Sequence, residues 1–198
     1  PILAGTSAAR KINGSGFDDK YVLESINSSE MRLRTSQADI YDVSKGAVVN
    51  ELSFTNPTDS LEINLTGGSD QLEIGSIDVG FNAHVFFLGG DDNSEDILVA
   101  GNTDNRWDID SLNTGRLNDN FLSFVGVESL AGGSADDAFV FADLADVDGI
   151  VSGGTDGYDT IDFSASSTGV AVKLNEKYLS IDRVIGSLAT TDKLVGPL

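Results

Sequence analysis

Apolar and polar residues alternate in short runs along much of the chain. Period-two alternation is typical of strands with one buried face. It occurs in LEINL at 61–65, in FNAHVFFL at 81–88 and in VAVKL at 170–174. The segment 28–43 comes nearest to a helical period, but its threonine, serine and aspartate residues favour loop and strand. The pattern therefore predicts an all-β protein.

Glycine-rich acidic turns separate the predicted strands at a recurring interval. Similar stretches cover residues 12–23, 65–74, 87–99, 130–141, 151–163 and 184–195. Gly67 and Gly89 are 22 residues apart, Gly132 and Gly153 are 21 apart, and the other intervals are close to whole or half multiples of that step. Half steps indicate a coil with two comparable sides and a turn at each. The spacing predicts a parallel β-helix, or β-solenoid, with coils of about 21–22 residues.

The length of 198 residues fits one domain, in which 1–55 is less regular and 56–195 holds the repeats. The chain has no cysteine, so disulfides cannot stabilise it. No apolar run approaches the roughly 20 residues that span a bilayer, so we expect no membrane insertion. No export segment is present, and a start at Pro1 is what a fragment or a processed product would show.

Acidic residues outnumber basic ones, 32 to 12, which gives a formal net charge of −20. Such a surface repels nucleic acid and anionic membranes and attracts cations. Solubility alone could account for the excess. The aspartates, however, cluster beside glycines, which directs attention to metal binding.

The stretch GGSADDAFV at 132–140 matches the nonapeptide G-G-x-G-x-D-x-U-x, which binds Ca²⁺ in parallel β-rolls, with Ala135 in place of the third glycine. Four further stretches match less closely. Turn chemistry explains the same glycines and aspartates equally well, so both interpretations stay open. Because single copies are separated by strand and loop, we expect isolated Ca²⁺ sites and no shared row of ions. The candidate ligands are Asp136, Asp137, Asp156 and Asp159, then Asp91, Asp92 and Asp96, then Asp18 and Asp19.

Three blocks of sequence, at 56–101, 105–141 and 149–174, resemble the tandem modules of very large bacterial exoproteins. These adhesin-like proteins are related to the calcium-binding RTX family. The resemblance covers residues 56–195 and rests on motifs of low complexity. It implies a secreted, cell-surface, right-handed β-solenoid used for display, adhesion or scaffolding.

Parallel β-helices also include polysaccharide lyases and hydrolases, which need a catalytic site. The basic residues are scattered, and the G-x-S-x-G motif is absent. His84 is the only histidine, and its alternation with inward residues places it on the outer face of a strand. We therefore expect no enzyme and assign no catalytic or organic-cofactor residues, with a polysaccharide-active β-helix kept as an alternative.

Two kinds of partner are expected. Surface glycans could stack on Trp107, aligned with Tyr158 or Tyr178, although the indole could equally fill the interior. Neighbouring modules or further copies could add end to end, since neither terminus has an obvious cap and the segments 1–7 and 194–198 are apolar. The leading prediction is a non-enzymatic extracellular structural or adhesive module. A filament or surface-layer subunit and a glycan-binding module are the alternatives.

Overall fold

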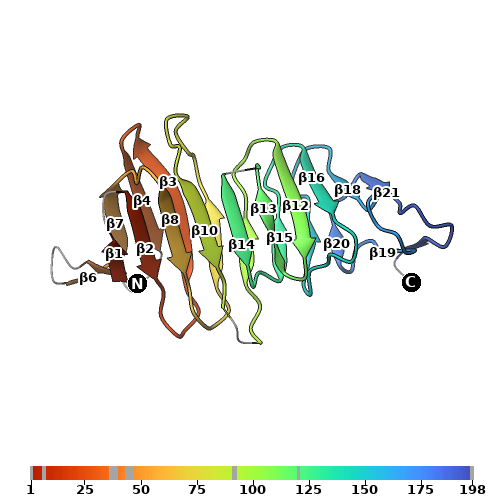
Figure 1. Cartoon of the computed structure of the whole chain (residues 1–198), viewed down its shortest axis with the longest axis horizontal. Coiled ribbons are helices and arrows are strands. Elements are labelled where there is room, and N and C mark those ends of the chain that lie inside the picture. Colours follow the sequence, from red (N-terminus) through yellow and green to blue (C-terminus); the bar gives the residue numbers. More distant parts are fainter. Residues whose placement is uncertain are drawn as a thin grey trace.

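The structure is a computed structural model, and it describes residues 2–5, 8–35, 40–42, 47–90, 93–119 and 121–196. These residues form an elongated stack of β-strands (Figure 1). They include no helix, and so no segment that meets the length and hydropathy of a membrane-crossing helix. The all-β prediction is confirmed.

The strands form three sheets of 12, 8 and 2 strands, here called sheets A, B and C. In spatial order sheet A contains β21 (Arg183–Ile185), β18 (Thr160–Asp162), β16 (Asp137–Phe141), β12 (Asn105–Ser111), β13 (Thr114–Leu117), β14 (Leu122–Val125), β10 (His84–Leu88), β8 (Ser60–Asn64), β2 (Ala9–Asn13), β1 (Ile2–Gly5), β5 (Ile40–Asp42) and β6 (Ala47–Val49). Sheet B contains β20 (Tyr178–Leu179), β17 (Val151–Ser152), β15 (Ser129–Ala131), β11 (Ile97–Val99), β9 (Gln71–Ile74), β3 (Lys20–Asn27), β4 (Glu30–Thr35) and β7 (Glu51–Thr55). Sheet C contains β19 (Ala171–Lys173) and β22 (Lys193–Val195).

Most strands pair in parallel with the strand that follows in the same sheet after one excursion through the other. In sheet A, β8 pairs with β10 and β16 pairs with β18. In sheet B, β9 pairs with β11 and β15 pairs with β17. The step between paired residues is 21 from Leu130 to Val151 but 37 from Phe87 to Phe124. A uniform coil of 21–22 residues is therefore wrong, because turns of different length and an inserted hairpin lie between the paired strands.

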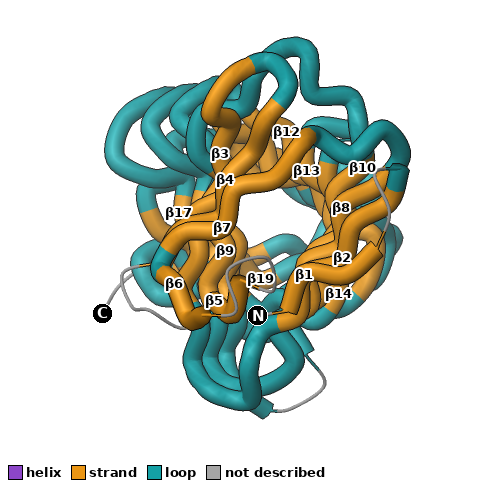
Figure 2. The backbone as a smooth tube through the Cα atoms, turned by 90° about the vertical axis from the view of Figure 1, so that its left-hand side faces the viewer, coloured by secondary structure: helices purple, strands orange, loops and turns teal. Residues whose placement is uncertain are grey.

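Sheets A and B lie on opposite sides of a common interior, with loops gathered between them (Figure 2). Two sets of turns connect them. The A-to-B turns follow β2, β8, β10, β14 and β16, and the B-to-A turns follow β9, β11, β15, β17 and β20. Every turn of one set lies at the same corner of the stack, so side chains at equivalent positions of successive turns are neighbours.

The core consists of columns of inward side chains, one residue from each strand. Ile12, Ile63, Phe87 and Phe124 form one column in sheet A, and all are fully buried. A second sheet A column contains Trp107, Phe139 and Ile161. The opposing sheet B column contains Tyr21, Leu72, Leu98, Leu130, Val151 and Tyr178. Alternation along each strand, which the sequence predicted at 61–65 and 81–88, places these residues inside.

An antiparallel hairpin, β12 and β13, interrupts the parallel order of sheet A. β14 pairs in parallel with the earlier β10, whereas β12 pairs in parallel with the later β16, and β13 lies antiparallel between β12 and β14. Sheet B has only β15 at the same level, between β11 and β17. Sheet A therefore gains two strands that sheet B does not match.

The two ends of the stack differ. At the N-terminal end β4 and β7 extend sheet B in antiparallel fashion, and their inward residues Met31, Leu33, Leu52 and Phe54 are buried. At the C-terminal end Leu188 and Leu194 are 78% and 66% exposed. The prediction that neither terminus is capped is thus wrong for the N-terminal end, where antiparallel strands complete the core. Of the apolar segments 1–7 and 194–198, residues 1, 6, 7, 197 and 198 lie outside the described part.

Candidate functional site

Carboxylates that are buried or half-buried form a column along the A-to-B turns. Asp19, Asp70, Asp96 and Glu128 each directly precede a strand of sheet B. The Asp19 backbone N–H donates to Asp70 Oδ1 at 2.7 Å, and the Asp70 N–H donates to Asp96 Oδ1 at 2.8 Å. The Asp96 N–H donates in turn to Glu128 Oε2 at 2.9 Å. The carboxylates of Asp70, Asp96 and Glu128 thus each accept a main-chain hydrogen bond from the A-to-B turn before, whereas the carboxylate of Asp19 accepts from the Ser15 N–H of its own turn.

A second column follows the B-to-A turns and begins where the first one ends. The Asn105 side-chain amide donates to Asp137 Oδ1 at 2.9 Å. The Asp137 N–H donates to Asp159 Oδ1 at 2.9 Å, and the Asp159 N–H donates to Asp182 Oδ2 at 2.9 Å. The acidic turns therefore change corner at the inserted hairpin, between the glycine pairs that begin at Gly89 and Gly132.

Paired glycines make room for the second column. A Cβ on Gly132 would overlap Asp137 Oδ2, and a Cβ on Gly153 would overlap Asp159 Oδ2. The next residues, Gly133 and Gly154, each have a φ of +122°. A side chain is strongly disfavoured in that conformation. The first glycine of each pair admits the carboxyl group, and the second allows the turn.

Burial changes the protonation of this column. Asp137 is 1% exposed, and burial raises its pKa to about 7, aided by the negative charge of Asp159. The hydrogen bond from Asn105 opposes this shift. Within the described part of the chain, Asp137 Oδ2 is buried without a hydrogen-bond partner. Burial also raises the pKa of Asp159. Desolvation disfavours the charged carboxylate, so Asp137 holds a proton close to neutral pH.

The candidate calcium ligands fall into two groups. Asp19, Asp96, Asp137 and Asp159 are buried members of the columns. Asp18, Asp136 and Asp156 are exposed on the same turns, Asp18 accepting the Ser69 N–H at 3.0 Å and Asp136 the Tyr158 N–H at 2.8 Å. Asp91 and Asp92 lie outside the described residues. No three acidic or histidine side chains converge as a metal site among the residues whose positions are described.

Sequence reasoning missed Asp70, Asn105, Glu128 and Asp182 as members of the columns. The motif at 67–72 is shorter than the others, and Asn105 and Glu128 lie outside the glycine motifs. Their common signal is position, since each is the first residue of a strand or lies one residue before it. A polar residue at every strand start, read together with parallel register, would have identified them.

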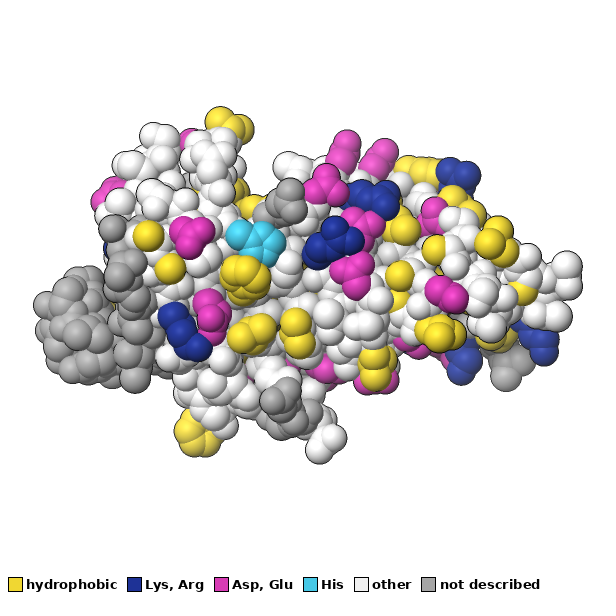
Figure 3. Space-filling view, viewed as in Figure 1, with side chains coloured by type: hydrophobic (Ala, Val, Ile, Leu, Met, Phe, Trp, Pro, Cys, Tyr) yellow, Lys and Arg dark blue, Asp and Glu magenta, His cyan; other side chains and the backbone are white. Residues whose placement is uncertain are grey.

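The outer face of sheet A carries ion pairs (Figure 3). The pairs are Lys11 with Glu62, Arg106 with Asp108, and Arg116 with Asp110. His84 lies on this face as the alternation predicted, half-buried, with Nε2 3.0 Å from Ser123 Oγ.

Trp107 is fully buried and stacks on Phe139, with ring centroids 5.5 Å apart. It cannot serve as an exposed platform for a glycan, because it faces the core from β12. Tyr178 is also buried, whereas Tyr158 is 56% exposed on a turn. The row of aromatic residues expected for glycan stacking is therefore not formed by these three residues.

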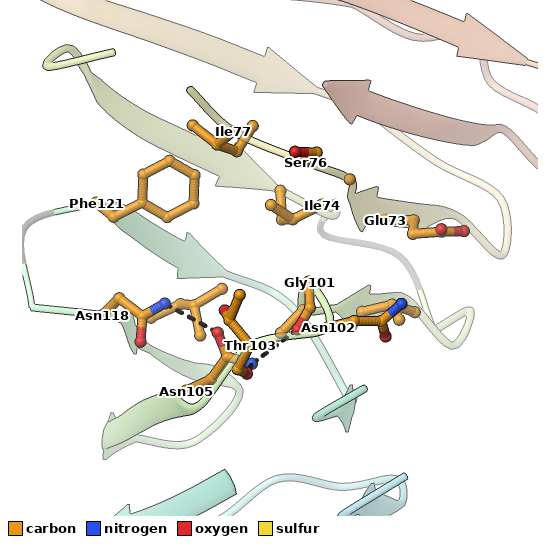
Figure 4. A pocket seen from close by; sticks show the side chains of 14 residues that line it. Glu73, Ile74, Ser76, Ile77, Gly101, Asn102, Thr103, Asn105, Asn118 and Phe121 are labelled. Carbon is orange, nitrogen blue, oxygen red and sulfur yellow. Dashed lines mark hydrogen bonds between the residues drawn. The ribbon is translucent and has the colours of Figure 1, made fainter. Parts of the chain in front are cut away.

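A pocket of about 460 Å³ lies at the B-to-A corner beside the inserted hairpin. One wall is residues 73–77, and the opposite wall contains Gly101, Asn102, Thr103 and Asn105, with Asn118 and Phe121 at one end (Figure 4). The walls diverge because the chain after β11 passes forward to β12 instead of stacking on β10. Asn105 fixes the lower wall: its amide donates to Gly101 O at 2.9 Å, and its Oδ1 accepts from Asn118 Nδ2 at 2.9 Å.

No protein family, no curated protein and no solved structure matches the chain. Its function is therefore argued from its own residues.

Proposed function

We propose that the chain is a β-solenoid that acts outside the cell as a non-enzymatic structural or adhesive module. The observation that supports this most strongly is the pair of carboxylate columns. Each connects successive coils through main-chain hydrogen bonds, as in Asp137 to Asp159, 22 residues later. Repeats stabilised by their nearest neighbours suit an extended rod that spaces or displays other parts. The net charge of −20 would keep such a rod soluble.

The cell-surface location and the relation to RTX-type exoprotein modules belong to the same proposal. They are supported by the resemblance of the three blocks of sequence between residues 56 and 195. The chain has no cysteine, so its fold depends on no disulfide and is compatible with an oxidising environment outside the cell.

Calcium is the cofactor we propose for the acidic turns. The carboxylates of Asp18, Asp136 and Asp156 are exposed on glycine-containing turns, and carboxylate and backbone carbonyl oxygens are ligands of the kind Ca²⁺ prefers. Melting the chain in CaCl₂ and in excess EGTA tests this part. A higher melting temperature in CaCl₂ is expected. Identical melting curves would refute calcium binding and would leave the proposal of a structural rod unchanged.

Microspheres coated with the chain test the function as a whole. They should be retained under flow on surfaces bearing polysaccharide, while albumin-coated spheres are washed away. The same polysaccharides, incubated with the chain, should release no new reducing ends. Release of reducing ends would overturn the proposal in favour of a polysaccharide-active enzyme. If the spheres are not retained and no reducing ends are released, the adhesive role is refuted and only a role as a spacer is left.

A filament or surface-layer subunit is the second candidate, and the C-terminal end favours it. Leu188, Leu194 and Val195 are exposed there beside the unpaired edges of β20, β21 and β22. An open edge of this kind can pair with another chain or with a neighbouring module. Sedimentation velocity as a function of concentration checks it: a constant monomer would rule out the filament.

A further inference from the structure

We propose that the pocket beside the inserted hairpin binds a neutral pyranose sugar. This inference rests on the adhesive part of the proposed function and supplies its ligand. Its volume of about 460 Å³ lies within the roughly 300–1,000 Å³ of small-ligand sites. The pocket is preformed, because its floor contains the buried residues Ile74, Ala100 and Leu117 and its lower wall is held by Asn105.

The polar part of the lining suits hydroxyl groups. Ser76, Asn102 and Thr103 are exposed at the mouth, and their side chains make no hydrogen bond to any described residue. Hydroxyls and a carboxamide offer both donors and acceptors. A sugar hydroxyl also donates and accepts, so it can pair with each of them. An apolar ligand would bury these groups without hydrogen-bond partners, which disfavours its binding.

The apolar part of the lining suits a sugar ring. Ile77 and Phe121 stand next to each other at one end of the pocket (Figure 4). Phe121 is held edge-to-face by Phe81, with ring centroids 6.3 Å apart. A pyranose presents C–H groups on its ring faces and hydroxyls around its rim, which matches an apolar end with polar walls.

The charge of the pocket selects against ionised ligands. Glu73 is the charged residue of the lining, and neither Lys nor Arg contributes among the described residues that form it. A net charge of −20 adds to the repulsion of anions. Phosphates and uronates are therefore disfavoured. Glu73 lies at the end opposite Phe121, away from the apolar end that would receive the sugar ring (Figure 4).

The test is a titration of the isotope-labelled chain with the methyl pyranosides of glucose, galactose, mannose and N-acetylglucosamine, followed by amide chemical shifts. One of the four should move the amides of residues 74–77 and 101–105. The dissociation constant should be on the order of 1 mM, as expected for about thirteen non-hydrogen atoms. Asn102→Ala and Thr103→Val should each weaken binding about tenfold with unchanged melting temperature.

The matched controls are Asn93→Ala and Thr155→Val, because both residues are exposed on turns outside the pocket. They should bind like the unmodified chain. Three results would overturn the inference: no shift at these amides with any of the sugars, equal loss in the controls, or shifts produced by tetramethylammonium chloride and not by a sugar. Retained microsphere adhesion with no shift would refute the pocket alone, whereas shifts without adhesion would refute the proposed function alone.

Discussion

Asp137→Asn tests the buried carboxylate column through its electrostatics. The amide is close in shape to the carboxyl group, and its oxygen can still accept from Asn105 Nδ2, now 2.9 Å from Asp137 Oδ1. The main-chain hydrogen bond from residue 137 to Asp159 is untouched. The substitution therefore removes a titratable group and leaves the packing and the hydrogen bonds in place.

The magnitude follows from the pKa, which rises from 3.8 to about 7 on folding. At about pH 3 and below, the group is mostly protonated in both the folded and the unfolded chain and hardly affects the unfolding free energy. As the pH rises to 7 the unfolded chain loses its proton first, so the folded state becomes less stable, by about 4 kcal/mol for three pKa units. Asp137→Asn removes this loss, and at pH 8 its melting temperature should be about 8–16 °C higher.

The assay is denaturant and thermal unfolding of both chains from pH 4 to pH 8 in excess EGTA. The difference in unfolding free energy should be smallest at pH 4 and should grow with pH. Asp156→Asn is the matched control, since Asp156 is exposed on the following B-to-A turn. A difference that does not change with pH would refute the reasoning. A variant that is less stable at pH 8 would show that the fold needs the charged carboxylate.

Three further changes probe the same architecture by equilibrium unfolding. Gly132→Ala should destabilise the chain by about 1–3 kcal/mol or more, because its Cβ would overlap Asp137 Oδ2. Gly16→Ala is the control: its Cβ would meet no atom, so this variant should be as stable as the unmodified chain. Equal destabilisation by the two substitutions would contradict the close packing of Asp137 against Gly132. Asp96→Ala should cost about 1–3 kcal/mol, because the buried Asp70 N–H loses its acceptor, and a neutral result would mean that this column contributes little. Trp107→Ala should cost about 3–5 kcal/mol through the cavity it leaves, and a small loss would place the indole outside the core.

The interior of the strands could be predicted from sequence because alternation is a local property. Leu61, Ile63 and Leu65 are buried as their spacing indicated, and so are Val85 and Phe87. Burial of one face requires only that a strand forms, whichever strand lies beside it.

The columns could not be predicted, because register depends on turns of variable length. Asp19 bonds to Asp70, 51 residues away, while Asp70 bonds to Asp96, 26 residues away. The glycine motifs marked the corners but gave no way to tell which corner each occupied. Their change of corner at the hairpin is a property of the whole stack.

The hairpin has a signal of its own in the sequence, inside the block 105–141 that resembles a single repeat. Residues 105–117 contain an alternating run followed by Asn113, whose φ of +51° closes the turn between β12 and β13. Asparagine adopts such angles more readily than most residues, so an Asn between two short alternating runs is a signal for a tight hairpin turn. Recognising it would have explained the interval of 43 residues between Gly89 and Gly132.

The most direct test of the central claim, that carboxylates join consecutive coils, is a coupling across the hydrogen bond in nuclear magnetic resonance. A long-range correlation between the amide nitrogen of Asp137 and the side-chain Cγ of Asp159 reports on the 2.9 Å bond itself. The account predicts this coupling, together with those of Asp159 to Asp182 and Asp19 to Asp70. A coupling from the Asp137 amide to a main-chain carbonyl of its own turn, with none to Asp159, would contradict it.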